Sequence, residues 1–281
     1  MSLQNILVVA TSCQKTNENT IRSALKLASH HNAHLTGVFV VPPLDIPVYF
    51  NAPPPQSLVE AQSKASAEAL DQSSKLFETL TKKYGWENRV TWRSFEGNPI
   101  DIISINARYA DITIMGQQKS VEEDYIYSPY IEDIIMSSGK PVLVIPETGI
   151  EDQIFSNRVL VAWDSSREAA RAVSDSMLFL EKAEFVTVCV IDANNKPPLS
   201  GETAAIQLTE HLARHQISAQ ANYEIVEKES VAEALIRKVK DTNSDMIVMG
   251  GYGESKLRQI LMGSTTGYIM KNMTVPVLFS H

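Results

Sequence analysis

The sequence predicts an α/β fold in which two copies of one parallel-sheet domain follow each other along the chain. Three observations support this prediction. Short Val- and Ile-rich runs alternate with amphipathic segments, the whole alternation occurs twice, and 281 residues correspond to two domains at roughly 150 residues each. Strands buried on both faces of a parallel sheet form nearly continuous apolar runs, as these segments do.

Four segments of the first half recur in the same order in the second half: 5–11 with 158–164, 17–33 with 167–181, 110–116 with 244–250, and 140–145 with 275–279. Such a repeat indicates a duplicated unit. The polar, turn-rich segment from Pro146 to Ser156 is typical of a linker. We therefore predict domains over residues 1–147 and 156–281.

The predicted strands are 5–10, 34–41, 89–95, 111–115 and 142–145 in the first half, and 158–163, 185–191, 219–226, 246–249 and 276–279 in the second. Helices separate them, with apolar residues three and four positions apart, as at Ala61, Ala65 and Leu80. Ligands of parallel sheets bind at the carboxyl ends of the strands. Function is therefore expected just after Trp163, Val190 and Met249.

Composition excludes several classes of protein. Lys and Arg total 25 against 33 Asp and Glu, so the formal net charge of -8 argues against binding to nucleic acid or to an anionic membrane. The first ten residues lack the features of a signal peptide, and no apolar run is long enough for a membrane span. Two cysteines cannot build a disulfide framework or a Cys-rich zinc site. We expect a cytoplasmic protein.

The Pro-rich segment from Pro42 to Gln56 is an excursion that the second half lacks. Its prolines keep it out of helices and sheet ladders. It is either an ordinary surface excursion or a loop that serves as a lid or contacts a partner.

The segment 249–266 is the most informative part of the sequence. Gly250 and Gly253 lie three positions apart, and Gly263 with Ser264 follows ten positions later. Glycines let a backbone turn sharply and approach a ligand, and consecutive amides bind anions. Ser264 is a candidate N-cap of a helix over 268–272, where free amides favour phosphate. Ordinary turn and cap residues remain the alternative. The segment is neither a Walker A loop nor the dinucleotide fingerprint.

Gly250-x-x-Gly253, nine residues, and then Gly263-Ser264 resemble the ATP-binding motif of the universal stress protein family. The resemblance extends over nearly the whole chain, including Val-Ile-Asp at 190–192 and the closing Pro-Val-Leu. It implies two Rossmann-like (adenine nucleotide alpha hydrolase-like) domains, each a five-stranded parallel sheet flanked by helices. It also implies that the two domains pair through their last strands within one chain, and it allows a further homodimer.

The resemblance implies that ATP or AMP binds in the second half, with Mg²⁺ as an optional companion. Asp164 would then meet the adenosine beside Ala162 and Trp163, Val190 would pack on adenine, and Met249 would line the pocket. Ribose and phosphates would be surrounded by Gly250, Gly253, Gly263, Ser264, Thr265 and Thr266. From the residues alone, Asp164 is equally a helix N-cap together with Ser165 and Ser166, and Val190 is equally a core residue. Trp163 departs from the small residue expected there.

The first half does not keep the motif. Thr11 stands in place of Asp164, and Lys119 stands in place of Gly253. The positions of Gly263 and Ser264 are taken by Pro129 and Tyr130, which remove an amide donor and add bulk. We therefore expect a degenerate site without nucleotide in the first half.

These observations favour a stress-response protein that acts as a nucleotide-dependent regulator or sensor. A slow ATPase and a ligand-free scaffold are the alternatives. No catalytic residue is identified, because no convincing general base is visible. No metal site is identified either. His211 and His215 lie four positions apart but lack a third ligand, and the adjacent His30 and His31 are expected to point apart on a helix.

Overall fold

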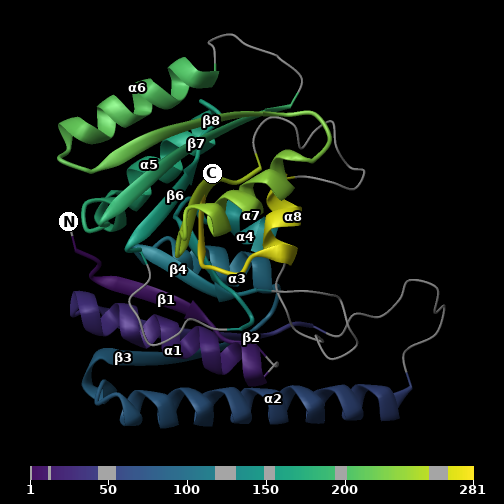
Figure 1. Cartoon of the computed structure of the whole chain (residues 1–281). Helices are drawn as coiled ribbons and strands as arrows, with labels where there is room; N and C mark the ends of the chain where they lie inside the picture. The colour runs from purple at the N-terminus through teal and green to yellow at the C-terminus, as the bar shows by residue number, and fades with distance from the viewer. Residues whose placement is uncertain are drawn as a thin grey trace.

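The structure is a computed structural model that describes residues 2–11, 14–43, 55–117, 131–148, 156–193, 201–252 and 265–281. Across these residues, ten strands form one continuous sheet in the order β3-β2-β1-β4-β5-β10-β9-β6-β7-β8 (Figure 1). The first five positions belong to the first half of the chain and the last five to the second. The sheet is thus two five-stranded sheets joined edge to edge.

The first half alternates strands with helices and pairs its strands in parallel. Its strands are β1 (Asn5–Val9), β2 (His34–Val41), β3 (Val90–Glu96), β4 (Ile112–Gly116) and β5 (Val142–Ile145). Its helices are α1 (Gln14–His31), α2 (Gln56–Lys83), α3 (Pro99–Ala107) and α4 (Ile131–Ser138), with a short 3₁₀ helix η1 (Glu87–Arg89).

The second half repeats this arrangement, again with parallel pairing. Its strands are β6 (Arg158–Ala162), β7 (Phe185–Ala193), β8 (Ala219–Val226), β9 (Met246–Gly250) and β10 (Val277–Ser280). Its helices are α5 (Arg167–Leu180), α6 (Gly201–Arg214), α7 (Val231–Asp241) and α8 (Thr265–Asn272).

The ten predicted strands are all present, with ends within two residues of those predicted. Three boundaries at the beginnings of helices also differ from those expected. Helix α1 begins at Gln14 rather than at residue 17, and α8 begins at Thr265 rather than at 268. The Pro-rich excursion ends at Pro55, because Gln56 is already the first residue of α2. Residues 44–54 of that excursion lie outside the described residues.

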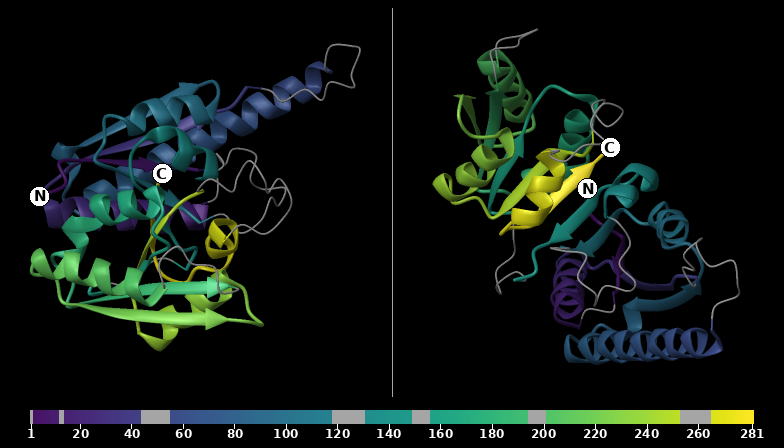
Figure 2. Two further views of the ribbon diagram at one scale, coloured as in Figure 1. Left: turned by 90° about the horizontal axis from the view of Figure 1, so that it is seen from above. Right: turned by 90° about the vertical axis from the view of Figure 1, so that its right-hand side faces the viewer.

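The helices cover both faces of the sheet. One buried cluster lies between the sheet and α1, α2, α5 and α6, and the other lies between the sheet and α3, α4, α7 and α8. Equivalent helices of the two halves therefore lie on the same face. Helix α2 extends beyond the rest of the first half (Figures 1 and 2), and the residues of its first turns, Leu58 and Val59 among them, are exposed.

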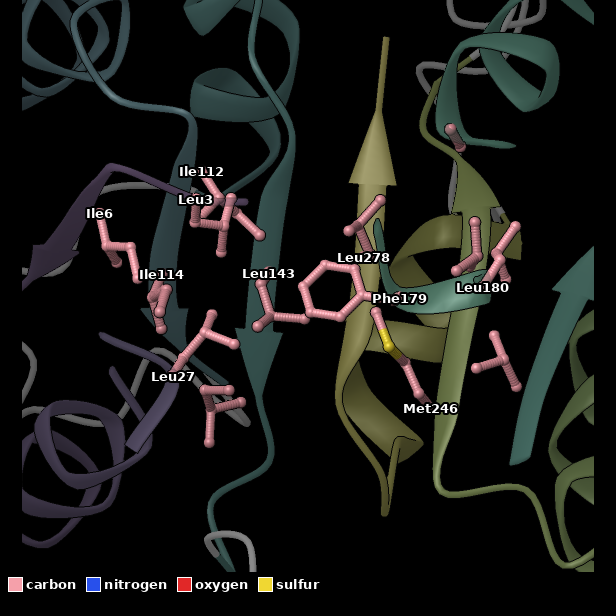
Figure 3. Packing of buried hydrophobic residues seen from close by; sticks show 14 of the residues in the cluster. Leu3, Ile6, Leu27, Ile112, Ile114, Leu143, Phe179, Leu180, Met246 and Leu278 are labelled. Atoms are coloured by element: carbon pink, nitrogen blue, oxygen red, sulfur yellow. The ribbon is translucent and has the colours of Figure 1, made fainter. Parts of the chain in front are cut away.

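The two halves meet at a seam formed by β5 and β10, which pair in antiparallel orientation. Leu143 lies opposite Leu278, and these leucines occupy the same position in the closing Pro-Val-Leu of their halves. A pseudo-twofold axis relating the halves therefore passes between them. Figure 3 shows the ring of Phe179, from α5, beside both leucines, and all three side chains are buried. The expected pairing of the halves through their last strands is confirmed.

Candidate functional site

The carboxyl ends of β6, β7 and β9 come together in the second half, as expected for a doubly wound sheet. Ala162, the last residue of β6, lies opposite Cys189 of β7 and Met249 of β9. The next residue, Trp163, donates its backbone N–H to the carbonyl of Cys189 at 2.8 Å. The structure thus brings Ala162, Trp163 and Met249 to one edge of the sheet.

Asp164 follows at this edge with an exposed side chain. Its Oδ1 accepts a hydrogen bond from the backbone N–H of Ser166 at 3.0 Å. Ser165 between them has a left-handed φ of 62°, so the chain turns sharply before α5. The N-cap of α5 is Ser166, whose Oγ accepts from the N–H of Ala169 at 3.1 Å. Of the three residues of the alternative interpretation, Ser166 is therefore the N-cap, and Asp164 is not the cap residue itself. Its carboxylate shapes the turn and faces solvent.

Val190 and Met249 are core residues, with exposed fractions of 4% and 5%. They belong to the two clusters on opposite faces of the sheet. The interpretation of Val190 as a core residue is thus confirmed, and its contact with adenine stays a prediction.

Gly250 ends β9 directly beside the beginning of α5. A Cβ at this position would lie 2.6 Å from the backbone nitrogen of Ala169 and 2.8 Å from the carbonyl carbon of Glu168. Real side chains do not tolerate such distances to backbone atoms. The close approach of α5 is therefore sufficient to require glycine at position 250, whether or not a ligand also comes close to the backbone there.

Glu168, beside Gly250, is a buried carboxylate that the sequence analysis did not single out. Its residue is only 5% exposed. Burial raises the pKa of its carboxyl, but its own backbone N–H and the guanidinium of Arg167 at 3.2 Å outweigh that effect, so that the pKa is lowered overall. Glu168 therefore stays ionised at neutral pH and forms an ion pair with Arg167 beside Gly250. The sequence signal that could have identified Glu168 is a charged residue on the apolar face of the helix predicted over 167–181.

The beginning of α8 completes the described part of the motif. Thr265 and Thr266 are its first two residues, and Thr266 is buried. Gly253, Gly263 and Ser264 lie outside the described residues. The expected surroundings of the phosphates, including Ser264 as N-cap of α8, therefore stay predictions.

At the equivalent edge of the first half, side chains bind the backbone of the residue that corresponds to Asp164. Thr11, which corresponds to Asp164, donates its backbone N–H to Oδ1 of Asn17 at 3.3 Å. Its carbonyl accepts from the hydroxyl of Ser73 at 2.9 Å, and Nδ2 of Asn17 donates to that hydroxyl at 3.3 Å. All three residues are buried. Lys119, Pro129 and Tyr130 of the predicted degenerate motif lie outside the described residues.

The histidine pairs show no metal site. The ring centroids of His211 and His215 are 5.0 Å apart, but in the described part of the chain no three His, Cys, Asp or Glu residues could hold a metal ion. His30 and His31 do not point apart as expected. Their rings are in edge contact, with centroids 5.0 Å apart at the end of α1. Among the described helices, none has the length and apolar character that crossing a membrane requires.

The sequence profile of the Universal stress protein family matches residues 3–146 and again residues 156–281. The chain therefore belongs to the universal stress protein family and carries two of its domains in tandem. A universal stress protein of Synechocystis is 27% identical over 152 residues, which are 53% of this chain and 49% of that protein. The chain thus spans about half the length of this curated relative.

Solved structures show the same fold. A universal stress protein from Archaeoglobus fulgidus is similar with a TM-score of 0.70 at 16% identity, over 98% of this chain and 95% of that one. A protein of unknown function from Pseudomonas aeruginosa is similar with a TM-score of 0.58 at 17% identity, over 99% of this chain and 92% of that one.

Proposed function

We propose that the second domain binds an adenine nucleotide, ATP or AMP, and that the chain acts as a nucleotide-dependent regulator or sensor in the stress response. The observation that carries this proposal is the difference between the two domains at equivalent positions. Asp164 is exposed at the end of β6, whereas Thr11 is buried and engaged by Asn17 and Ser73. The glycine motif that begins at Gly250 occurs in the same domain as Asp164.

In this proposal, Asp164 accepts a hydrogen bond from the adenosine, since one carboxylate oxygen binds Ser166 and the group faces solvent. The backbone amides around Gly253 and from Gly263 to Thr266 hold the phosphates. Local donors of this kind are needed, because the chain carries a net charge of -8. Mg²⁺ is an optional companion of the phosphates, since it is commonly bound through them.

The proposal is tested by thermal denaturation with ATP and with AMP, each with and without Mg²⁺. A ligand that binds only the folded protein raises the melting temperature in proportion to the logarithm of its concentration. We expect both nucleotides to stabilise the wild-type protein. Gly263→Val should abolish the effect by filling the phosphate pocket. Absence of stabilisation by any adenine nucleotide would favour the ligand-free scaffold.

Two further variants sharpen the test. Pro129→Val places the same side chain at the equivalent position of the first domain and should leave the nucleotide effect unchanged. Asp164→Asn keeps an oxygen for the Ser166 amide but removes the charge, so it should weaken binding at nearly unchanged stability without ligand. ADP release above the buffer background, lost in Asp164→Ala, would instead support the slow ATPase.

A further inference from the structure

The side chain of Gln117 crosses the seam from the first domain to the second. Gln117 directly follows β4 and is 1% exposed. Its Nε2 donates to the carbonyl of Met270 at 2.8 Å and to the carbonyl of Lys271 at 3.1 Å. Its Oε1 accepts from the backbone N–H of Glu147 at 3.0 Å. One uncharged amide thus joins the end of β5 in one domain to α8 in the other.

The two carbonyls that Gln117 binds belong to the last turn of α8. Carbonyls in the last turn have no partner within a helix and need one from elsewhere when buried. The amide of Gln117 has two N–H groups and supplies both. Helix α8 has eight residues and is therefore about 12 Å long. Because so short an element is rigid, holding its last turn also fixes its first residue, Thr265, which follows Gly263 and Ser264 directly.

The contact of Gln117 with α8 runs from the first domain to the second and has no counterpart from the second to the first. The pseudo-twofold axis relates Gln117 to Gly251, and it relates Met270 to Ile135, since both lie six positions before the proline of the closing strand. At Gly251 there is no side chain to reach across. A Cβ there would lie 2.8 Å from Cγ2 of Ile135 in α4. The first domain therefore binds the last turn of α8, while at the equivalent place Ile135 simply packs on Gly251.

We propose that Gln117 is a positioning residue for the nucleotide site of the other domain. It holds α8 so that the N-terminal end of this helix meets the phosphates. This inference rests on the proposed function and adds to it that the first domain, which has lost the motif, contributes to the site of the second. The effect of Gln117 is predicted to be specific to ligands that carry phosphates.

The test compares ATP with adenosine by isothermal titration calorimetry, at a temperature where every variant is folded. Gln117→Glu keeps the shape of the side chain and an oxygen for Glu147, but it turns an acceptor toward two carbonyls. Gln117→Ala removes all three hydrogen bonds. We expect each variant to weaken ATP binding on the order of tenfold, with adenosine affinity within about twofold of wild type. Lys182→Ala is the control, because it breaks another contact between the halves, from Lys182 Nζ to His30 Nε2 at 3.2 Å. It should change neither affinity.

Equal weakening of ATP and adenosine, or no change in ATP affinity, would overturn the inference. A wild-type protein without affinity for ATP would overturn the proposed function, and with it the role of Gln117 at a phosphate site. Amide hydrogen exchange from Ile269 to Met273 then separates the two failures. Faster exchange in Gln117→Glu shows that the residue still holds α8, whereas unchanged exchange shows that it does not.

Discussion

His31 is a buried histidine whose neighbours disfavour its charged form. It is the last residue of α1 and is 8% exposed. Burial is the main cause that lowers its pKa from 6.5 to about 4, and the positive charges of Lys182 and His30 add to it. Since Lys182 belongs to the second domain, this imidazole lies at a contact between the two halves.

The lowered pKa of His31 predicts an acid-sensitive stability. As pH falls below 6.5, the unfolded chain binds a proton that folded His31 does not bind until about pH 4. The free energy of unfolding is therefore unaffected by the titration of His31 above pH 6.5. It decreases between pH 6.5 and 4, by at most about 1.4 kcal/mol per pH unit for one proton. In His31→Gln the melting temperature should fall less steeply over this range. His215→Gln, at an exposed position, should follow the wild type, and parallel curves for all three proteins would contradict the prediction.

Gly250 gives a second prediction at the scale of single residues. Gly250→Ala should lower stability without any ligand, on the order of 1–3 kcal/mol, because the new Cβ meets backbone atoms of Glu168 and Ala169. Gly116→Ala is the matched variant in the first domain. Its Cβ would meet side-chain atoms of Thr16 and Thr20 at 2.5 Å. Both threonines are buried, and the hydroxyl of Thr20 donates to the carbonyl of Thr16, so this variant should also lose stability although its domain lacks the glycine motif. Thermal denaturation of the nucleotide-free proteins checks this, and wild-type stability of Gly250→Ala would show that the glycine serves only a ligand.

The individual elements show how far the sequence could predict the fold. Strands were predictable because both faces of a parallel sheet are covered by helices, so each strand forms an apolar run. Helix ends were less predictable. Gln56 was expected to belong to the Pro-rich excursion, although a proline commonly marks the beginning of a helix and α2 begins directly after Pro55. The pairing of β5 with β10 did not follow from the residues and came only from the family resemblance, and its antiparallel orientation was not predicted.

The candidate site was predictable only where neighbouring residues define it. Trp163 and Met249 lie at the expected edge because they occur at the carboxyl ends of adjacent strands. The bond from Ser73 to Thr11 was not predictable, since it depends on how α2 packs, 62 positions along the chain. Gln117 was visible in principle. Aligning the halves places it opposite Gly251, but the sequence does not show that its amide reaches Met270.

At the scale of the whole molecule, the seam joins the cores of the two domains. Leu143 and Leu278 belong to one buried cluster that contains residues of α1 and α2 as well as α5 and α6. Side chains of both domains thus share the same packing, and loss of one domain would expose apolar surface of the other. The two domains should therefore unfold together.

Calorimetry tests this coupling. The wild type should show one unfolding transition. Leu143→Ala should remove about 2–5 kcal/mol and separate the transition into two, because the truncated residue is fully buried at the seam. Leu25→Ala makes the same truncation in α1, where the side chain is 1% exposed, and should lower the melting temperature while one transition remains. Two well-separated transitions in the wild type would contradict the idea that the seam couples the domains.

The one-directional contact of Gln117 shows what joining two copies in one chain makes possible. In an isologous dimer of identical subunits, every substitution appears on both sides of the axis. Both subunits of such a dimer would then carry a glutamine at this position, or both would carry a glycine. Here Gln117 and Gly251 occupy equivalent places and are changed independently. Covalent fusion thus allows one copy to engage this edge with Thr11, Asn17 and Ser73, while the other copy keeps Asp164 exposed at the equivalent edge.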